Sequence, residues 1–423
     1  MTESIQSRVR RIVDASPVLD LHTHLFAPAF DGDGPQRFLL WGIDSLLTYH
    51  YLQAEFFRVR TDVAPEAFLA SPKADQADAI WRALFIERTP LSEACRGVVT
   101  TLARLGLDPG DASLDGYRGW FASQSPSAMV DRVMELSRVS HIVMTNEVFD
   151  EAEHAMWMER PESLRDPRFS AVLRIDTLLD DRSAALATLS RWGYDVSADL
   201  NNTGIAEIRR FLREWIVRTG AVYVAASLPP EFSFPSPGRP DAQWRDRVIA
   251  DALMPEAAEH GIAWAMMVGS RRGVNPRLAS AGDSLGPADV HSIERLCDRF
   301  PRNRFLATVL SRESQHALAV AARKFANLMP FGCWWFVNTP SLITEITRMR
   351  LELLGSSFIP QHSDARVLEQ LIYKWNHSRV CVADALAAQY AGLPDLEISD
   401  AMIEADAARL LRGNAAQSIT PGE

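Results

Sequence analysis

Two histidines lie at the end of an apolar stretch near the start of the chain, in the sequence VLDLHTHLF at positions 18 to 26. The stretch predicts a β-strand, and residues two apart on a strand point to the same face. His22 and His24 should therefore direct their imidazoles into one space. Imidazole is the commonest protein ligand for divalent transition metals, so the pair predicts a metal site. The alternative is a pair of ordinary histidines near a strand end.

Asp364 is the candidate for a third ligand, because it ends the last predicted strand, SSFIPQHSD at 356 to 364. In a closed barrel of eight strands the last strand lies beside the first. A carboxylate there can reach a cation held by His22 and His24, and it can also accept a proton. The alternative is that Asp364 caps a helix starting near Ala365.

Two arginines lie at the ends of predicted strands. Arg366 offers a fixed charge for a carboxylate or hydroxyl oxygen, unless it is a surface residue on the first turn of a helix. Arg174 ends the apolar run AVLR, where an unpaired guanidinium would be very costly. Its partner is either Asp176 or a substrate carboxylate, and the sequence leaves both open.

Several aromatic residues could also take part in chemistry. His50 and Tyr51, in the run TYHYLQAEFFR, can donate or relay protons, although periodicity alone would make them core residues of a helix. Trp334 and Trp335 either pack in the core or form an apolar wall against a sugar ring.

The chain has only three lysines, Lys73, Lys324 and Lys374, and none ends a predicted strand. A carbamylated lysine bridging two metals is therefore not available, and we predict a single metal ion.

Eight apolar runs alternate with amphipathic helices, which is typical of a (β/α)8 barrel of the TIM type, an α/β fold. A doubly wound sheet would show a glycine-rich first turn, which the chain lacks. The active site of such a barrel lies at the carboxyl ends of its strands, where the candidates fall. The predicted strands are 18–26, 141–146, 169–176, 221–229, 262–270, 304–313, 328–336 and 356–364.

We expect three parts along the chain. Residues 1–26 form an N-terminal helix and barrel strand one, and residues 27–125 form a helical insertion subdomain without a convincing buried strand. Residues 126–423 form the remainder of the barrel and the C-terminal helices.

Composition restricts the partners and the compartment. A net charge of -10 and 47% hydrophobic residues indicate a globular protein that binds neither nucleic acid nor an anionic membrane. The four cysteines are far apart, which favours reduced thiols, and no apolar run is long enough to span a bilayer. We therefore expect a cytoplasmic protein, a homo-oligomer, acting on a small molecule.

Taken together, these residues resemble the uronate isomerase (glucuronate isomerase) family of the amidohydrolase superfamily, as a divergent branch. The resemblance covers nearly the whole chain. It rests on five motifs: His22-x-His24, His50-Tyr51, the Phe-x-x-x-Leu-Arg-x-Asp ending of strand three, Trp334-Trp335-Phe336 and Asp364-x-Arg366.

The resemblance implies a distorted (β/α)8 barrel that interconverts an aldohexuronate, such as D-glucuronate or D-galacturonate, with its ketouronate through an enediol. It implies one divalent cation, with zinc as the first choice and manganese, iron, cobalt or nickel as alternatives. The implied roles are metal binding by His22, His24 and Asp364, substrate binding by Arg174, Arg366, Trp335, His50 and Tyr51, and catalysis by Asp364, Tyr51 and His50. The base, Asp364 or Tyr51, stays open.

Two departures from the family pattern affect the expected pocket. Strand five offers Met267 where a histidine is common, and Asn338 stands where an acidic residue is expected. These changes keep an alternative open, a mononuclear-metal lyase, hydratase or hydrolase acting on a modified uronate or another hydroxy-carboxylate. A catalytically silent barrel is a third hypothesis, which the two histidines and Asp364 disfavour.

Overall fold

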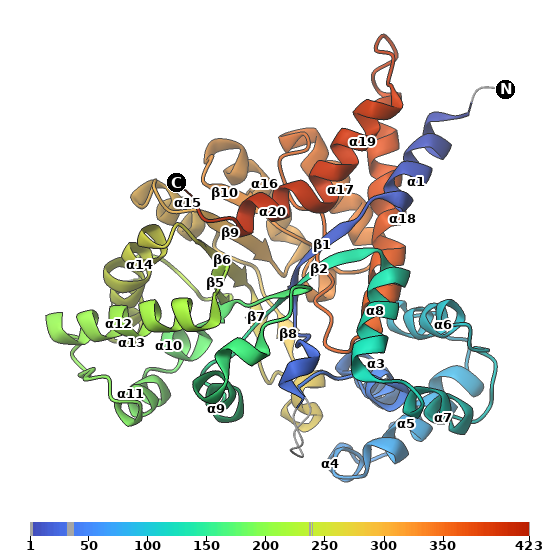
Figure 1. Ribbon diagram of the computed structural model, residues 1–423, viewed down its shortest axis with the longest axis horizontal. Helices are drawn as coiled ribbons and strands as arrows, with labels where there is room; N and C mark the ends of the chain where they lie inside the picture. The colour runs from blue at the N-terminus through green and yellow to red at the C-terminus, as the bar shows by residue number, and fades with distance from the viewer. Residues whose placement is uncertain (1–2, 32–37, 237, 239, 423) are drawn as a thin grey trace.

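The computed structural model describes residues 3–31, 38–236, 238 and 240–422. Parallel strands lie at its centre and helices surround them (Figure 1). Two parallel sheets have the orders β1-β2-β3 and β10-β9-β6-β5-β4. The strands are β1 (Val18–Thr23), β2 (Val139–Met144), β3 (Phe169–Ser170), β4 (Leu173–Arg174), β5 (Tyr223–Leu228), β6 (Ala263–Val268), β9 (Phe305–Val309) and β10 (Leu328–Pro330).

Backbone hydrogen bonds join the two sheets into a ring. On one side Asn146 forms a parallel bridge with Leu173. On the other side Ile359 bridges Phe331, and the N–H of Asp364 donates to the carbonyl oxygen of His22 at 3.1 Å. The predicted distorted (β/α)8 barrel is confirmed, with strand three split into β3 and β4 and strand eight reduced to an extended segment with one bridge.

Side chains replace the regular ladder along this strand-eight segment, residues 358–365. Pro360 has no N–H to donate. Gln361 accepts the N–H of His362 through Oε1, and Asp20 of β1 accepts the N–H of Ser363 at 3.0 Å. The segment is therefore held near its two ends by backbone hydrogen bonds and between them by side chains, which explains why it is not a regular strand.

Helices fill the space around the ring and the stretch between β1 and β2, where the described residues include no strand. The first group lies at the lower right of Figure 1, beside α8 (Pro126–Ser137) and α18 (Gln370–Ala391). It consists of α2 (Ile43–Leu47), α3 (His50–Val59), α4 (Pro65–Leu69), α5 (Lys73–Trp81), α6 (Glu93–Leu105) and α7 (Asp115–Ala122).

The remaining helices mostly follow the strands in the predicted alternation. A short antiparallel pair, β7 (Ser270–Arg271) and β8 (Ser284–Leu285), follows β6. These helices are α1 (Ile5–Ala15), α8 (Pro126–Ser137), α9 (Glu151–Glu159), α10 (Asp176–Asp180), α11 (Arg182–Arg191), α12 (Asn202–Thr219), α13 (Pro240–Arg247), α14 (Met254–Glu259), α15 (Val290–Arg299), α16 (Gln315–Lys324), α17 (Pro340–Leu354), α18 (Gln370–Ala391), α19 (Asp400–Ala408) and α20 (Asn414–Ile419).

The long helix α18 connects the barrel to the helices that follow β1. Its Trp375 donates through Nε1 to Asp20 of β1 at 2.8 Å. Its Lys374 pairs with Glu93 of α6 at 3.2 Å, and the side chains of this pair are only 3% and 11% exposed. None of the described helices combines the length and the apolar character that a membrane crossing needs.

Gly332 lies where the ring of strands closes at the strand-eight segment, and it packs tightly against His362. Its φ is +67° and its N–H donates to Ile359 at 2.8 Å, and an added Cβ would lie 1.9 Å from Cδ2 of His362. We predict that Gly332→Ala lowers the free energy of unfolding by about 3 kcal/mol, through backbone strain and overpacking. Denaturant unfolding measures this loss.

Gly193→Ala is the matched control, because Gly193 also has a positive φ, +84°, but no atom lies within 4 Å of its added Cβ. It should cost only about 1 kcal/mol, the backbone contribution. Equal losses in the two variants would contradict the close packing of Gly332 on His362.

Candidate functional site

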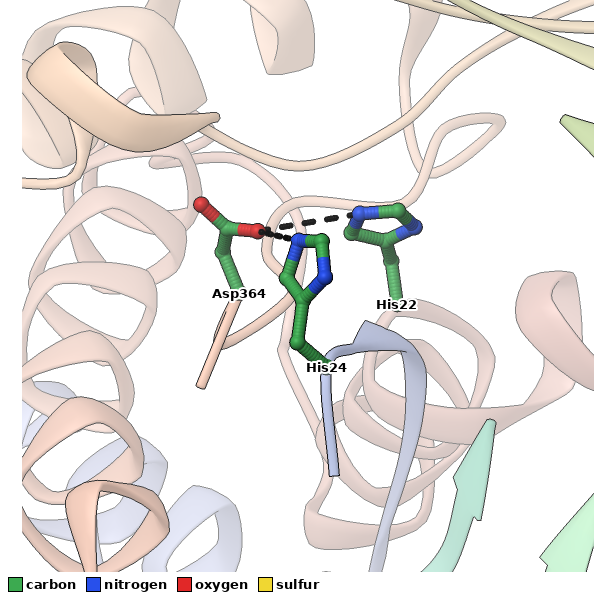
Figure 2. A group of neighbouring side chains, drawn as sticks. All are labelled: His22, His24 and Asp364. Carbon is green, nitrogen blue, oxygen red and sulfur yellow. Dashed lines mark ion pairs between the residues drawn. The ribbon is translucent and has the colours of Figure 1, made fainter. Parts of the chain in front are cut away.

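Three side chains converge where strand one meets the strand-eight segment (Figure 2). Nε2 of His22 lies 3.6 Å from Oδ1 of Asp364, and Nε2 of His24 lies 3.3 Å from the same oxygen. One ligand atom from each residue lies within 4.8 Å of the others. Two ligands about 2.1 Å from a tetrahedral ion are about 3.4 Å apart, so the spacing fits a single cation.

The polar atoms of this cluster also lack other partners. Nε2 of His22 and Oδ1 of Asp364 are buried and make no hydrogen bond with the described residues. Buried polar atoms nearly always have a partner, because an unsatisfied one is costly. A cation between the three side chains would satisfy both atoms, so the residues present fit a metal ion.

Neighbouring hydroxyls fix the form of both imidazoles. The Thr145 hydroxyl donates to a backbone carbonyl of β1 at 3.0 Å, so its oxygen must accept from Nδ1 of His24, 3.2 Å away. The Tyr223 hydroxyl donates to another β1 carbonyl at 2.8 Å and lies 3.5 Å from Nδ1 of His22. His24 is therefore protonated on Nδ1 and presents the Nε2 lone pair, as a metal ligand must, and the longer Tyr223 contact favours the same form of His22.

Burial and charge set the protonation states of the cluster. Burial lowers the pKa of His22 well below its ordinary value and that of His24 to about 4. Burial alone would raise the pKa of Asp364, but His24, His22 and Arg366 outweigh it and hold the pKa below the ordinary value. At neutral pH the cluster offers two neutral imidazoles and a carboxylate.

The backbone of Asp364 adopts an unusual conformation at this contact. Its φ of +53° is in the left-handed region, which is unfavourable for a residue other than glycine. The alternative role as a helix cap is wrong, because α18 begins only at Gln370. Arg366 accordingly does not lie on a first helical turn; its N–H donates to the Gln370 side chain at 2.8 Å.

Sequence reasoning missed three residues that support the cluster: Thr145, Tyr223 and Asp20. Asp20 accepts hydrogen bonds from Ser363 and Trp375, and burial raises its pKa to about 6. One signal was available for Asp20, since an acidic residue inside the apolar strand, two positions before His22, must have buried partners. Thr145 and Tyr223 gave no such signal.

His50, Trp335 and Arg366 line a cavity of about 230 Å³, and Arg366 follows the cluster residue Asp364 by two positions. Tyr51 does not line it, but its ring lies 4.6 Å from that of His50. Four buried polar atoms of these residues have no hydrogen-bond partner among the described residues: Nε2 of His50, the Tyr51 hydroxyl, Nε1 of Trp335 and Nε of Arg366. The structure thus brings together four of the five predicted substrate-binding residues, with unused donors and acceptors.

The two tryptophans have different environments. Trp334 does not line the cavity and packs in a core cluster with 3% of its surface exposed. Trp335 has a φ of +48°, lies parallel to Phe336 at 4.7 Å and carries the Arg272 guanidinium 5.3 Å above its ring. Only Trp335 can form a wall of the cavity.

Arg174, the fifth residue, has a structural partner. Its Nε and Nη2 donate to the Asp176 carboxylate at 3.0 and 2.6 Å, and Nη2 also donates to Ser227. Burial alone would lower the pKa of Arg174, but Asp176 and Glu147 outweigh burial and raise the pKa above its ordinary value. The guanidinium therefore stays charged. The first alternative for the partner of Arg174 is therefore seen directly.

Met267 and Asn338, the two departures from the family pattern, do not line the cavity. Met267 is buried in β6 and gives no nitrogen ligand. Asn338 was expected to touch the pocket. Instead, its side-chain amide nitrogen donates to the carbonyl oxygens of His362 at 3.4 Å and of Ser363 at 3.2 Å. An aspartate there could not donate, so the amide suits this bracing role.

Fold and site together define a class, the (β/α)8 barrels of the amidohydrolase superfamily with a candidate metal centre at the carboxyl ends of the strands. The chain is similar to a uronate isomerase from Bacillus halodurans C-125, with 48% identity, a TM-score of 0.94, and coverage of 100% of this chain and 98% of the other. The chain belongs to the uronate isomerase family.

Two more distant structures show the same fold. A uronate isomerase from Thermotoga maritima has 13% identity and a TM-score of 0.79, over 99% of this chain and 98% of the other. A glucuronate isomerase from Caulobacter crescentus has 15% identity and a TM-score of 0.74, over 98% and 93%. No protein-family model and no curated protein sequence matches the chain.

The role of Thr145 can be tested by its effect on metal affinity. Thr145→Val removes the acceptor that keeps the His24 proton on Nδ1, and we predict about tenfold weaker binding of Zn²⁺. Competition with a chromogenic chelator measures the affinity.

Thr347→Val is the control, because Thr347 is buried in α17 and its hydroxyl has no partner among the described residues. It should leave the affinity unchanged. Equal affinities for both variants and the wild type would contradict the assigned tautomer.

Proposed function

We propose that this protein interconverts an aldohexuronate, D-glucuronate or D-galacturonate, with the corresponding ketouronate. The observation that carries the proposal is the 48% identity to a uronate isomerase over the full chain. The cavity supports it, because its unpartnered polar atoms suit a small polyhydroxy acid. A carboxylated sugar offers many hydroxyls and one negative charge for these atoms.

Aldose to ketose conversion moves a proton between neighbouring carbons through an enediol, so it needs a proton acceptor and a group that polarises the carbonyl. A divalent cation bound by His22, His24 and Asp364 would supply that polarisation. We favour zinc, although this donor set does not separate zinc from manganese, iron, cobalt or nickel.

The protonation states assign different roles to the two candidate bases. Burial raises the pKa of Tyr51 well above its ordinary value, so the phenol keeps its proton and serves as a donor. Asp364 is ionised and can accept a proton. We therefore propose Asp364 as the proton acceptor, with Tyr51 and His50 donating to or accepting from substrate oxygens.

The substrate carboxylate is assigned to Arg366. Its buried Nε has no partner among the described residues, and its side chain lines the cavity next to Asp364. Arg174 already donates two hydrogen bonds to Asp176, so its charge is matched within the protein. We propose that Arg174 contacts other oxygens of the substrate.

The proposed reaction can be followed by proton NMR in deuterium oxide with the metal-loaded protein. D-Glucuronate or D-galacturonate should give ketouronate with deuterium on the carbon next to the carbonyl. His22→Ala and Asp364→Asn should lower the rate by about a thousandfold or more.

Asp384→Asn, which changes a side chain of α18 that is 60% exposed, should have no effect. A folded, metal-loaded protein that forms no ketouronate would contradict the isomerase. Elimination, hydration or hydrolysis products from carboxylated sugars would then support the alternative metalloenzyme.

Replacing Arg366 tests the assignment of the carboxylate. Arg366→Gln should lower kcat/KM for the uronate by about thirtyfold, mainly through KM, because it removes a charge-assisted hydrogen bond. Steady-state kinetics measure the change. Arg312→Gln, at a guanidinium that is 58% exposed and paired with Glu345, should leave both constants unchanged. A normal KM in the Arg366 variant would contradict the assignment.

A further inference from the structure

Lys374 lies in the second turn of α18 with its charged end inside the protein. The residue is only 2% exposed, and a lysine is almost never fully buried unless its charge is paired. Its Nζ donates to Oε1 of Glu93, the first residue of α6, at 3.2 Å, and no other described residue accepts a hydrogen bond from it. Glu93 therefore explains why the charge is tolerated, but it uses only one of the three N–H groups.

Two aromatic rings also lie beside the ammonium. Nζ of Lys374 is 5.5 Å from the ring centroid of Tyr51 on α3 and 5.3 Å from that of Tyr373 on α18. A cation within about 6 Å of an aromatic ring centroid, over the face of the ring, is attracted to it, and the attraction grows when water is excluded. Lys374 thus joins Tyr51 to the helices α6 and α18.

The direction of the Tyr51 phenol depends on contacts made by its ring. Its hydroxyl is buried and makes no hydrogen bond with the described residues. The ring lies edge-on to that of His50 at 4.6 Å and close to parallel with that of Phe336 at 6.2 Å. Of these ring neighbours and Lys374, the lysine alone carries a charge, because burial lowers the pKa of His50 to about 3.

Glu93 connects this ammonium to the strand-eight segment as well. Its Oε1 lies 3.8 Å from Nδ1 of His377, and Nε2 of His377 lies 3.4 Å from Oδ1 of Asn338. Asn338 in turn donates to two carbonyl oxygens of the strand-eight segment. One buried cluster therefore contacts both the helix that carries Tyr51 and a residue that braces the segment carrying Asp364.

Stability alone does not account for the ion pair between Lys374 and Glu93. A buried ion pair can often be replaced by apolar residues of similar volume without loss of stability, because forming it removes two charges from water. Lys374 does not line the cavity either, so it is not placed to bind the sugar acid itself. Its contact with Tyr51 is the feature that reaches the site.

We propose that Lys374 is a positioning residue of the site: its ammonium, held by Glu93, fixes the Tyr51 ring so that the phenol is directed at the sugar acid. The inference rests on the proposed function, in which Tyr51 acts on a substrate oxygen. It adds a residue that touches no substrate and acts through another side chain.

The test removes the ion pair without leaving a lone buried charge. Lys374→Met/Glu93→Gln replaces both ends together, and it is made with Tyr51 present and in Tyr51→Phe. Arg209→Met/Glu256→Gln is the matched control, because it removes an ion pair with a fully buried carboxylate between α12 and α14, on the other side of the molecule in Figure 1. Steady-state kinetics of the metal-loaded proteins with D-glucuronate and D-galacturonate give kcat and KM.

Removing the ion pair should lower kcat about tenfold and leave KM within about twofold, because a misdirected phenol weakens the reaction more than it weakens binding. In Tyr51→Phe, which has no phenol to direct, removing the ion pair should cause no further loss of kcat. Such non-additivity shows that Lys374 acts through Tyr51. The control variant should match the wild type in both constants.

A fluorine NMR spectrum reports on the Tyr51 ring without any turnover. With 3-fluorotyrosine in place of the seven tyrosines, the Tyr51 signal is identified by its absence from Tyr51→Phe. Removing the ammonium of Lys374 should shift this signal and that of Tyr373. The signal of Tyr194, whose ring lies under the guanidinium of Arg210 instead, should not move.

An equal loss of kcat with and without the Tyr51 phenol, an unchanged kcat, or an unmoved Tyr51 fluorine signal would overturn the proposal. If the paired variant does not fold, Lys374→Met/Glu93→Met, which fills the space with apolar atoms, replaces it. Failure of both to fold would show a purely structural ion pair and would also overturn the proposal. A wild type that forms no ketouronate would contradict the proposed function, whereas the fluorine spectra would still decide whether Lys374 positions Tyr51.

Discussion

The site depends on a seam of backbone hydrogen bonds between strand one and the strand-eight segment. The Asp364 N–H donates to the His22 carbonyl at 3.1 Å, and the His24 N–H donates to that of Ala365 at 2.7 Å. These two bonds bring the carboxylate beside imidazoles from the opposite end of the chain. They also hold Asp364 in the left-handed conformation that an isolated peptide would rarely adopt.

The seam is stable because buried side chains replace the missing ladder around it. Asp20, Gln361 and Asn338 together satisfy backbone groups of His362 and Ser363, the two residues before Asp364. Each of these side chains is almost fully buried, so a broken hydrogen bond could not be replaced by water. A second layer, the hydroxyls of Thr145 and Tyr223, then orients the imidazoles. The geometry of the cluster is thus set by the protein's own hydrogen bonds.

Much of this site could be predicted from the sequence, because strand period and barrel closure are local or topological rules. These two rules were enough to predict that His22 and His24 share one face and that Asp364, on the last strand, lies beside them. The split of strand three and the irregular strand eight could not be predicted, since they depend on side chains that compete with the backbone ladder. The partner of Arg174 stayed open for a similar reason: a short motif does not show which anion is nearer in space.

The buried ion pair between Lys374 of α18 and Glu93 of α6 has a consequence for how the molecule comes apart. Replacing either residue with a neutral one would leave the other charge buried and unpaired, at a cost of about 3 to 5 kcal/mol. The same helix, α18, holds strand one through Trp375 and Asp20. Nζ of Lys374 also lies 5.5 Å from the ring centroid of Tyr51 on α3. Helix α18 therefore couples the helices that follow β1 to the strand that carries His22, and we expect them to melt in a single transition.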